Sequence, residues 1–272
     1  PPMTNDYLVT NTFFSSAVVN KELSPPSISP EYIARRNDRY LLLEGLQEHT
    51  TKYRLFCCGR YKISPTAMPG VKLDQDTGSS YITQVKRCGY AQFCPVCSAK
   101  IGNVRAGEIN KAVERALELG HGIYMATLTV PHGPKHTLNE LRTVQKGAFQ
   151  AVASGRRWQA DRADFGILGQ IRTEESTVGL NGWHPHQHLL FFTDKPLDNY
   201  EALQDRIFER WSNYVVSEGY DRPDRQRNKI VEIKEQKGVG RYLSKMGSEL
   251  ARPDLKVAKK KNWNHWQLAW GA

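Results

Sequence analysis

The sequence predicts an α+β fold: an antiparallel or mixed central sheet with helices mainly on one face, plus a small cysteine-rich module. Two observations support this prediction. Strand-like apolar runs alternate with segments of helical periodicity, and a turn at 179–182 joins two of the strands into a hairpin. All five cysteines lie between Cys57 and Cys97, which distinguishes that region from the rest of the chain.

The first 30 residues are rich in serine and proline, and we expect them to form a flexible arm. Ser29 and Pro30 suit the N-cap and first position of a helix, which should continue to Leu46. A second helix is expected at 98–119, where apolar residues recur at helical spacing and a glycine follows. The predicted parts are an arm at 1–30, a helix and cysteine module at 31–100, and a larger domain at 101–272.

The larger domain should begin with a strand at 122–130, where an apolar run ends at a proline. Residues 137–140 have the Thr-x-x-Glu form of a capping box, so a helix should start there. A strand from Phe165 to about Glu175 should then form the hairpin. A helix containing residues 203–215 and a strand at 230–233 are expected next.

The composition favours a polyanionic partner. The chain has 38 lysines and arginines against 28 acidic residues, a formal charge of +10, and nucleic acid is the commonest partner of such a surface. A membrane surface would also attract this charge. No apolar stretch approaches the roughly 20 residues of a membrane span, and no signal sequence is evident. We therefore expect a soluble, cytoplasmic protein with no membrane partner.

The cysteine spacing predicts a structural zinc site. Cys94 and Cys97 form a C-x-x-C pair, Cys88 precedes them by six residues, and a fourth ligand must be Cys57 or Cys58. Zn²⁺ in structural sites binds four sulfur or nitrogen ligands tetrahedrally. We favour Cys58, since Gly59 after it would allow a tight turn around the ion. A redox pair or simple core packing would also fit a C-x-x-C, whereas the odd number of cysteines argues against a disulfide framework.

A second candidate metal site lies on the histidine strand. His184, His186 and His188 alternate along one apolar run, so an extended strand places all three on one face and Gln187 on the other. Neutral imidazoles spaced in this way could bind one divalent ion. The alternative is a surface strand with incidental histidines. His132 and His136 could contact a substrate or could be ordinary loop residues, and we favour the loop interpretation.

Three short motifs resemble those of rolling-circle replication initiators (Rep proteins) of small plasmids, in the HUH endonuclease superfamily. They are Thr127-Leu128-Thr129, His186-Gln187-His188 and Tyr242-Leu243-Ser244-Lys245, in that order. The cysteine segments and the stretches at 172–175 and 181–186 resemble the same family, so the similarity extends over about residues 55–270. The related relaxases of conjugation place the tyrosine ahead of the histidines, whereas it follows them here.

The resemblance implies a ferredoxin-like HUH palm fold and a set of residue roles. Tyr242 would be the nucleophile that forms a 5′-phosphotyrosyl link, and Lys245 would assist it at the phosphate. Mg²⁺ or Mn²⁺ would be held by His186, His188 and a third ligand. Glu175 is the favoured third ligand because it precedes His186 by eleven residues, with His184 as the alternative.

The resemblance also implies the substrate and partners. The protein would nick one strand at a plasmid replication origin in a bacterial or archaeal cell, binding single-stranded DNA and origin duplex, with a host helicase as a further candidate partner. The predicted DNA contacts are Arg172 and the tail residues Lys259, Lys260 and Lys261. An HUH transposase, or a nonenzymatic zinc-containing DNA-binding regulator, is the alternative function.

Two positions depart from the family pattern. The residue between the motif histidines is usually bulky and apolar, but it is Gln187 here. Some single-tyrosine initiators also have a glutamate four residues before the tyrosine, where this chain has Gly238. The residue that would support termination is therefore open.

Overall fold

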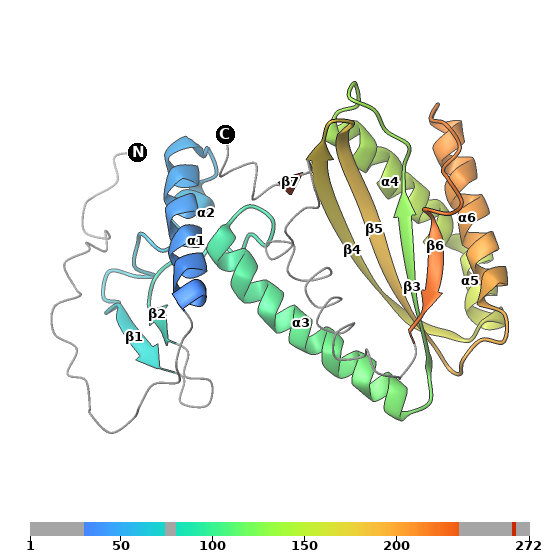
Figure 1. Cartoon of the computed structure of the whole chain (residues 1–272). Coiled ribbons are helices and arrows are strands. Elements are labelled where there is room, and N and C mark those ends of the chain that lie inside the picture. The colour runs from blue at the N-terminus through green and yellow to red at the C-terminus, as the bar shows by residue number, and fades with distance from the viewer. Residues whose placement is uncertain (1–29, 74–79, 234–262, 265–272) are drawn as a thin grey trace. The chain divides into compact units, whose positions relative to one another are not determined.

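The structure is a computed structural model that describes residues 30–73, 80–233 and 263–264 (Figure 1). The chain divides into two compact units, one ending at Ile101 and one beginning at Gly102, and each is described by itself. The predicted arm up to residue 29 and the basic tail around 259–261 lie outside the described residues. Among the described helices, none combines the length and the apolar character needed to cross a membrane.

The first unit is built around its cysteines. Helix α1 (Pro30–His49) starts at the predicted proline and extends three residues past the predicted end. A single turn α2 (Tyr53–Phe56) and a hairpin of β1 (Gly70–Leu73) and β2 (Ser80–Thr83) were not predicted. All four residues of β1 are exposed, so no buried face distinguishes this strand.

Helix α3 (Pro95–Glu118) begins in the first unit and continues into the second. It starts three residues before the predicted Ser98. Proline lacks an amide hydrogen and has a fixed φ, which suits the first turn of a helix, where that hydrogen would have no partner within the helix. The helix therefore begins directly after Cys94, and Cys97 lies in its first turn.

Five described strands of the second unit form an antiparallel sheet in the order β6-β3-β5-β4-β7. The strands are β3 (Gly122–Thr129), β4 (Ile167–Gly179), β5 (Gly182–Thr193), β6 (Lys229–Glu232) and β7 (Trp263–Asn264). The predicted hairpin is confirmed as β4 and β5. Strand β4 continues four residues beyond the predicted Glu175, because its pairing with β5 extends to the turn.

Three helices cover one face of this sheet, namely α4 (Leu138–Ala153), α5 (Gly155–Asp164) and α6 (Tyr200–Ser217) (Figure 1). The predicted capping box is confirmed, since Thr137 accepts a hydrogen bond from the amide of Glu140 and the Glu140 carboxylate accepts one from the Thr137 amide. The predicted inward residues are buried: Leu141, Val144, Ala148 and Val152 on α4, and Leu203, Ile207, Trp211 and Val215 on α6.

Helix α5 was missed because its sequence is mostly charged and polar, without an apolar stripe. Its buried Asp161 instead forms ion pairs with Arg206 and Arg210 of α6. The second half of α3 packs on the opposite face of the sheet, where Ile109, Val113 and Ala116 join a smaller apolar cluster. Of the helices that the structure describes, three therefore pack on one face of the sheet and part of α3 packs on the other.

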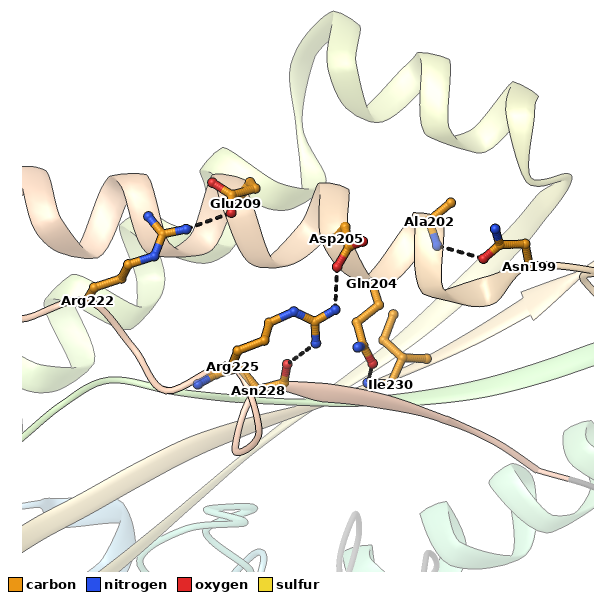
Figure 2. A network of polar contacts seen from close by, with 9 residues as sticks. All are labelled: Asn199, Ala202, Gln204, Asp205, Glu209, Arg222, Arg225, Asn228 and Ile230. Atoms are coloured by element: carbon orange, nitrogen blue, oxygen red, sulfur yellow. Dashed lines mark hydrogen bonds and ion pairs between the residues drawn. The ribbon is translucent and has the colours of Figure 1, made fainter.

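A polar network fixes strand β6 at one edge of the described sheet. Figure 2 shows Arg222 pairing with Glu209 of α6, and Arg225 bridging Asp205 of α6 and the carbonyl of Asn228. The backbone amide of Ile230 donates to the Gln204 side chain. These contacts tie the segment after α6 to that helix, so β6 is positioned where it can pair with β3.

Candidate metal centres

The pairing of β5 with its two neighbours brings three predicted residues together. In the registers, Glu175 of β4 is opposite His186, and Thr173 of β4 is opposite His188. On the other side, Thr129 and Thr127 of β3 are opposite the same two histidines. Residues directly opposite in an antiparallel pair project from the same face. The face of the sheet that carries the histidines therefore also carries Glu175.

Glu175, His186 and His188 form a compact buried group that could hold a metal ion. One carboxylate oxygen of Glu175 lies 2.9 Å from His186 Nε2 and 3.9 Å from His188 Nε2. An octahedral ion with bonds of about 2.1 Å places neighbouring ligands about 3.0 Å apart and opposite ligands about 4.2 Å apart. The measured 2.9 Å and 3.9 Å are close to these two spacings, so the donor atoms fit a small divalent ion.

Thr127 orients His188 toward this group. The Thr127 hydroxyl lies 3.1 Å from His188 Nδ1. When Nδ1 donates its hydrogen to that hydroxyl, the lone pair of Nε2 points toward Glu175, which is the arrangement that metal-binding histidines use. Within the described part of the chain, His188 Nε2 is buried and has no hydrogen-bond partner, as expected of an atom whose partner is an ion.

His184 lies outside the group of three. Its Nδ1 is 3.3 Å from Nδ1 of His132, and the two rings are 4.5 Å apart. Burial is the largest cause that lowers the pKa of His184 to about 4, followed by the neighbouring His186 and His132. His184 is therefore neutral at neutral pH. His132, interpreted as a loop residue, extends the row of histidine rings beyond His184.

The opposite face of the hairpin carries the residues whose side chains point away from the metal group. Gln187 is fully buried there and donates to Glu174 at 3.3 Å, and Glu174 accepts from Arg142 of α4 at 2.7 Å. These contacts accommodate a polar residue at a position where the family pattern has an apolar one. Arg172, a predicted DNA contact, also lies on this face, where its guanidinium is 4.3 Å from the Phe149 ring centroid.

The second candidate metal centre is a cluster of four cysteines in the first unit. Cys58, Cys88, Cys94 and Cys97 are buried and bring their sulfur atoms together, whereas Cys57 is not part of the group. Three sulfur–sulfur distances are 3.6 to 3.7 Å. A tetrahedral ion with metal–sulfur bonds of about 2.3 Å requires edges of about 3.8 Å. The sequence choice of Cys58 over Cys57 thus agrees with the geometry.

Local backbone geometry holds the sulfur atoms in place. Gly59 and Gly89 follow Cys58 and Cys88 with φ of 77° and 70°, a conformation that glycine adopts at little cost. The amide of Cys97 lies 3.4 Å from the Cys94 sulfur, so the first turn of α3 directs a hydrogen toward a thiolate. The Gln47 side chain donates to backbone carbonyls around α2, including that of Cys58 at 2.8 Å.

The thiols of this cluster cannot all ionise without a cation. Burial raises the pKa of Cys88 to about 12, and hydrogen bonds of the protonated Cys94 thiol with Cys58 and Cys97, followed by burial, raise the pKa of Cys94. Hydrogen bonds from Cys58 and Cys94 lower the pKa of Cys97. One thiolate is thus stabilised by its protonated neighbours. A divalent ion would replace the shared protons and allow all four sulfurs to bind as thiolates.

Other predicted site residues lie outside the described part of the chain, namely Tyr242, Lys245, Lys259, Lys260 and Lys261.

The structure adds two positions that were not predicted from the sequence. Asn228 is buried and fixes Thr129, accepting from its amide at 2.7 Å and donating to its hydroxyl at 3.2 Å. Exposed Lys229 is opposite Thr127 in the register, which places a cation on the histidine face. Neither residue belongs to a recognisable motif.

Comparison with known proteins gives two relatives. One, named "Protein rep", is from Streptomyces lividans and is 34% identical over 42% of this chain. The other, named "Neomycin resistance protein", is from Streptomyces cyanogenus and is 30% identical over 42% of this chain. The chain is Rep-like over this part. The resemblance predicted from the three motifs is confirmed at that level.

The matched region covers 31% and 32% of the two relatives, so the chain spans about one third of the length of the curated relatives it matches. No family model matches the chain, and no solved structure is significantly similar to it. What the Rep-like chain does must therefore be argued from its own residues.

The cysteine cluster leads to a prediction about folding. We expect one bound metal ion per chain, and we expect Cys94→Ser to lose the ion and to lower the free energy of unfolding by several kcal/mol, since metal binding and folding are coupled in such modules. Cys57→Ser is the matched control and should retain both. Native mass spectrometry and thermal unfolding measure the two quantities. A folded wild-type chain without metal would contradict the prediction.

The contact between Thr127 and His188 leads to a second prediction. Thr127→Val keeps the side-chain shape and removes the hydroxyl, so affinity for Mn²⁺ at the Glu175 group should fall by at least about tenfold. Thr127→Ser restores the hydroxyl and should recover most of the affinity. Titration calorimetry with Mn²⁺ gives the dissociation constants, and equal affinities for the valine variant and wild type would show that Thr127 does not orient the ligand.

Proposed function

We propose that this chain is a metal-dependent DNA-nicking protein that starts rolling-circle replication at a plasmid origin. The observation that carries the proposal is the buried group of Glu175, His186 and His188 in a chain that is similar to a Rep protein. A Rep protein that nicks DNA needs a positive charge at the scissile phosphate, and this group offers the ligands to hold one.

The proposed fold is the HUH palm. The strand order β3-β5-β4 supports it, because it places the first motif, the histidine motif and the predicted acidic ligand on three neighbouring strands. Thr127 is opposite His188, and Glu175 is opposite His186, so the motifs that are distant in sequence meet on one face. Among the described helices, α4, α5 and α6 lie on the opposite face and α3 packs against Leu190 and Ile123, so none of their core contacts involves the histidines.

The proposed catalytic ion is Mg²⁺ or Mn²⁺. Mn²⁺ accepts both imidazole nitrogen and carboxylate oxygen as ligands, whereas Mg²⁺ prefers the carboxylate oxygen. Phosphate and water would fill the remaining ligand positions. When bound, the ion neutralises the non-bridging phosphate oxygens, where negative charge grows in the transition state. His188, held by Thr127, and His186, held against Glu175, would hold this ion.

Tyr242 is the proposed nucleophile. Its oxygen attacks phosphorus, the bond to the 3′ oxygen breaks, and that oxygen leaves as a hydroxyl after taking up a proton. The 5′-phosphotyrosyl bond conserves the energy of the phosphodiester, so a later attack by a 3′ hydroxyl can rejoin the strand. Lys245 would hold the phosphate and favour the ionised phenol.

Chain length supports this assignment. Strand β6 is followed by Ile233, whose amide bonds to the carbonyl of Ile123 at the far end of β3. From Ile123 to Thr129, beside His186, six strand residues cover about 20 Å. The nine residues from Ile233 to Tyr242 can extend to about 30 Å, so the tyrosine can reach the metal group from this anchor.

The proposed DNA contacts fall into two sets. Lys229 on the histidine face and the tail residues Lys259, Lys260 and Lys261 would bind phosphates near the nicking site. Arg172 lies on the other face of β4 from Glu175, so it would contact DNA away from the scissile phosphate. The substrate would be single-stranded DNA at the origin, with flanking duplex DNA and a host helicase as further partners.

We assign zinc to the cysteine cluster. Four thiolates at tetrahedral spacing select Zn²⁺ over Mg²⁺ or Mn²⁺, which prefer oxygen. The ion would be structural, since four sulfurs complete its coordination and leave no position for a substrate. The two centres would therefore hold different metals in one chain.

Formation of a covalent adduct tests the proposed function. Incubation of the chain with Mn²⁺ and either supercoiled or single-stranded origin DNA should yield a protein–DNA band that survives denaturation. A hydrolytic nuclease would leave a free 5′ phosphate and no attached protein, and a nonenzymatic regulator would bind DNA without cutting it. An HUH transposase would form the same adduct on transposon ends, so the DNA that is cut distinguishes these two.

The metal group leads to a prediction about nicking. His186→Ala and His188→Ala should abolish nicking and retain most of the affinity for duplex DNA, which rests on lysine and arginine contacts to phosphate. Glu175→Ala should raise the Mn²⁺ concentration for half-maximal nicking by at least about tenfold. Glu174→Ala is the matched control, since Glu174 faces Arg142 on the opposite side of β4. Wild-type nicking by both histidine variants across a Mn²⁺ series would refute the metal assignment.

Tyr242→Phe gives the most direct prediction of the mechanism. The variant keeps the ring and loses only the attacking oxygen, so folding and DNA binding should persist while nicking and adduct vanish. Lys245→Ala should slow the reaction without abolishing the adduct, because the ion already supplies positive charge at the phosphate. Mass spectrometry of the adduct peptide should identify Tyr242.

Two other tyrosines serve as internal controls for that mapping. A hydrogen bond with Glu218 is the largest cause of a raised pKa at Tyr214, and burial raises the pKa of Tyr220. Both phenols are thus harder to ionise and weaker nucleophiles. An adduct peptide that contains Tyr214 or Tyr220 would disprove the assignment of Tyr242.

A further inference from the structure

The cysteine module carries more positive charge than a structural metal site requires. Eight lysines and arginines against two aspartates leave residues 50–101 at +6. Four thiolates around a divalent ion would lower this to about +4. Both aspartates, Asp74 and Asp76, lie outside the described residues, and no carboxylate side chain occurs in the described part of this stretch.

Three of these cations gather at one pocket. Arg54, Lys86 and Arg87 line it together with Tyr53, Cys57 and Ile63. Backbone pairing builds the pocket, since the Gly59 amide donates to the Lys86 carbonyl at 2.8 Å and the Lys86 amide donates to the Tyr61 carbonyl at 2.7 Å. Residues 58–61, which include Cys58 of the cysteine cluster, therefore also position Lys86 at the pocket.

The arginines of the pocket have different roles. Arg54 is held in place, because it donates to the Cys88 carbonyl at 2.6 Å and lies 5.2 Å from the Tyr90 ring centroid. Arg87 is exposed. Its guanidinium lies beside Gly59, since a methyl group added at that glycine would be 3.6 Å from it. In the part of the chain that the structure describes, neither arginine forms an ion pair with a carboxylate. Both guanidinium charges are thus available to an anion.

An exposed aromatic ring completes the pocket. Tyr53 has 58% of its surface accessible to solvent, so its ring can be reached from solution. A hydrogen bond with the Cys57 thiol is the largest cause of a raised pKa at Tyr53, so the phenol is neutral and does not repel phosphate. A flat neutral ring beside several cations is the arrangement that binds unpaired nucleotides.

We propose that this pocket of the cysteine module is a second DNA-binding site, specific for single-stranded DNA, separate from the nicking group. Arg87 and Lys86 would contact backbone phosphates, and Tyr53 would stack on a base. Duplex DNA is disfavoured, because its base faces are stacked against one another and cannot reach Tyr53. The inference rests on the proposed function in that the chain acts on DNA, and it adds a site that holds the strand independently of cleavage.

Binding to a fluorescent single-stranded oligonucleotide tests the site. Full-length chain is used without added Mg²⁺ or Mn²⁺, so that no cleavage occurs. Tyr53→Ala should weaken binding by about tenfold, while Tyr53→Phe, which keeps the ring, should bind like wild type. Arg87→Gln should weaken binding and reduce the slope of log affinity against log salt by about 0.7. Arg54 is left unchanged because its contact with Cys88 is structural.

Arg156→Gln is the matched charge control. It removes the same charge from an exposed position on α5, and it should leave the affinity within about twofold of wild type. Native mass spectrometry of every variant checks that the metal of the cysteine cluster is retained. An equal loss of affinity for a matched duplex or RNA would overturn the assignment to single-stranded DNA, and wild-type affinity of Tyr53→Ala and Arg87→Gln would overturn the site itself.

The two proposals fail separately. In one outcome the chain forms the covalent adduct, and Tyr53→Ala and Arg87→Gln bind single strands as well as wild type. The nicking function then stands and the second site is absent. A chain that never forms an adduct, but loses single-strand affinity in both variants, has the second site and lacks the nicking function.

Discussion

The pairing of β5 with both of its neighbours is the constraint on which the candidate catalytic site depends. A shift of one residue in either register would turn the facing side chains to the other side of the sheet. In the observed register, His186 meets Glu175 on one side and Thr129 on the other, while His188 meets Thr127. Both faces of β5 are packed, so apolar burial on the α4 and α6 side holds the polar group in place on the other.

The two candidate metal centres show how donor chemistry follows local structure. The cysteine cluster is the core of its unit, joined by Leu43 and Leu55, so an ion there would stabilise a region with little apolar material of its own. The group of Glu175 and two histidines lies on a sheet with two apolar cores, so an ion bound there would not have to supply the stability of the unit. The first site is suited to structure and the second to chemistry.

The sequence predicted those parts of the fold that depend on residues close to one another in the chain. The capping box at Thr137, the helical spacing on α6 and the alternation along β5 are short-range patterns, and each was predicted. Cys58 was favoured over Cys57 because Gly59 follows it, whereas Glu175 was expected from the resemblance to rolling-circle replication initiators. Helix α5 and the β1–β2 hairpin could not be predicted, because ion pairs such as that of Asp161 with Arg206 hold α5, and β1 is exposed throughout.

The contacts that were missed are those between residues distant in sequence. Asn228 fixes Thr129 from 99 positions away, and Thr127 orients His188 from 61 positions away. Gln187 departs from the apolar residue of the family pattern, but its side-chain NH2 group donates to Glu174, which Arg142 in turn neutralises. One face of β4 carries Glu175, whose group has the geometry of a metal site. The other face carries Glu174, which Arg142 neutralises, so the two faces are chemically distinct. The adjacent carboxylates Glu174 and Glu175 can therefore have different roles, one structural and one suited to binding metal.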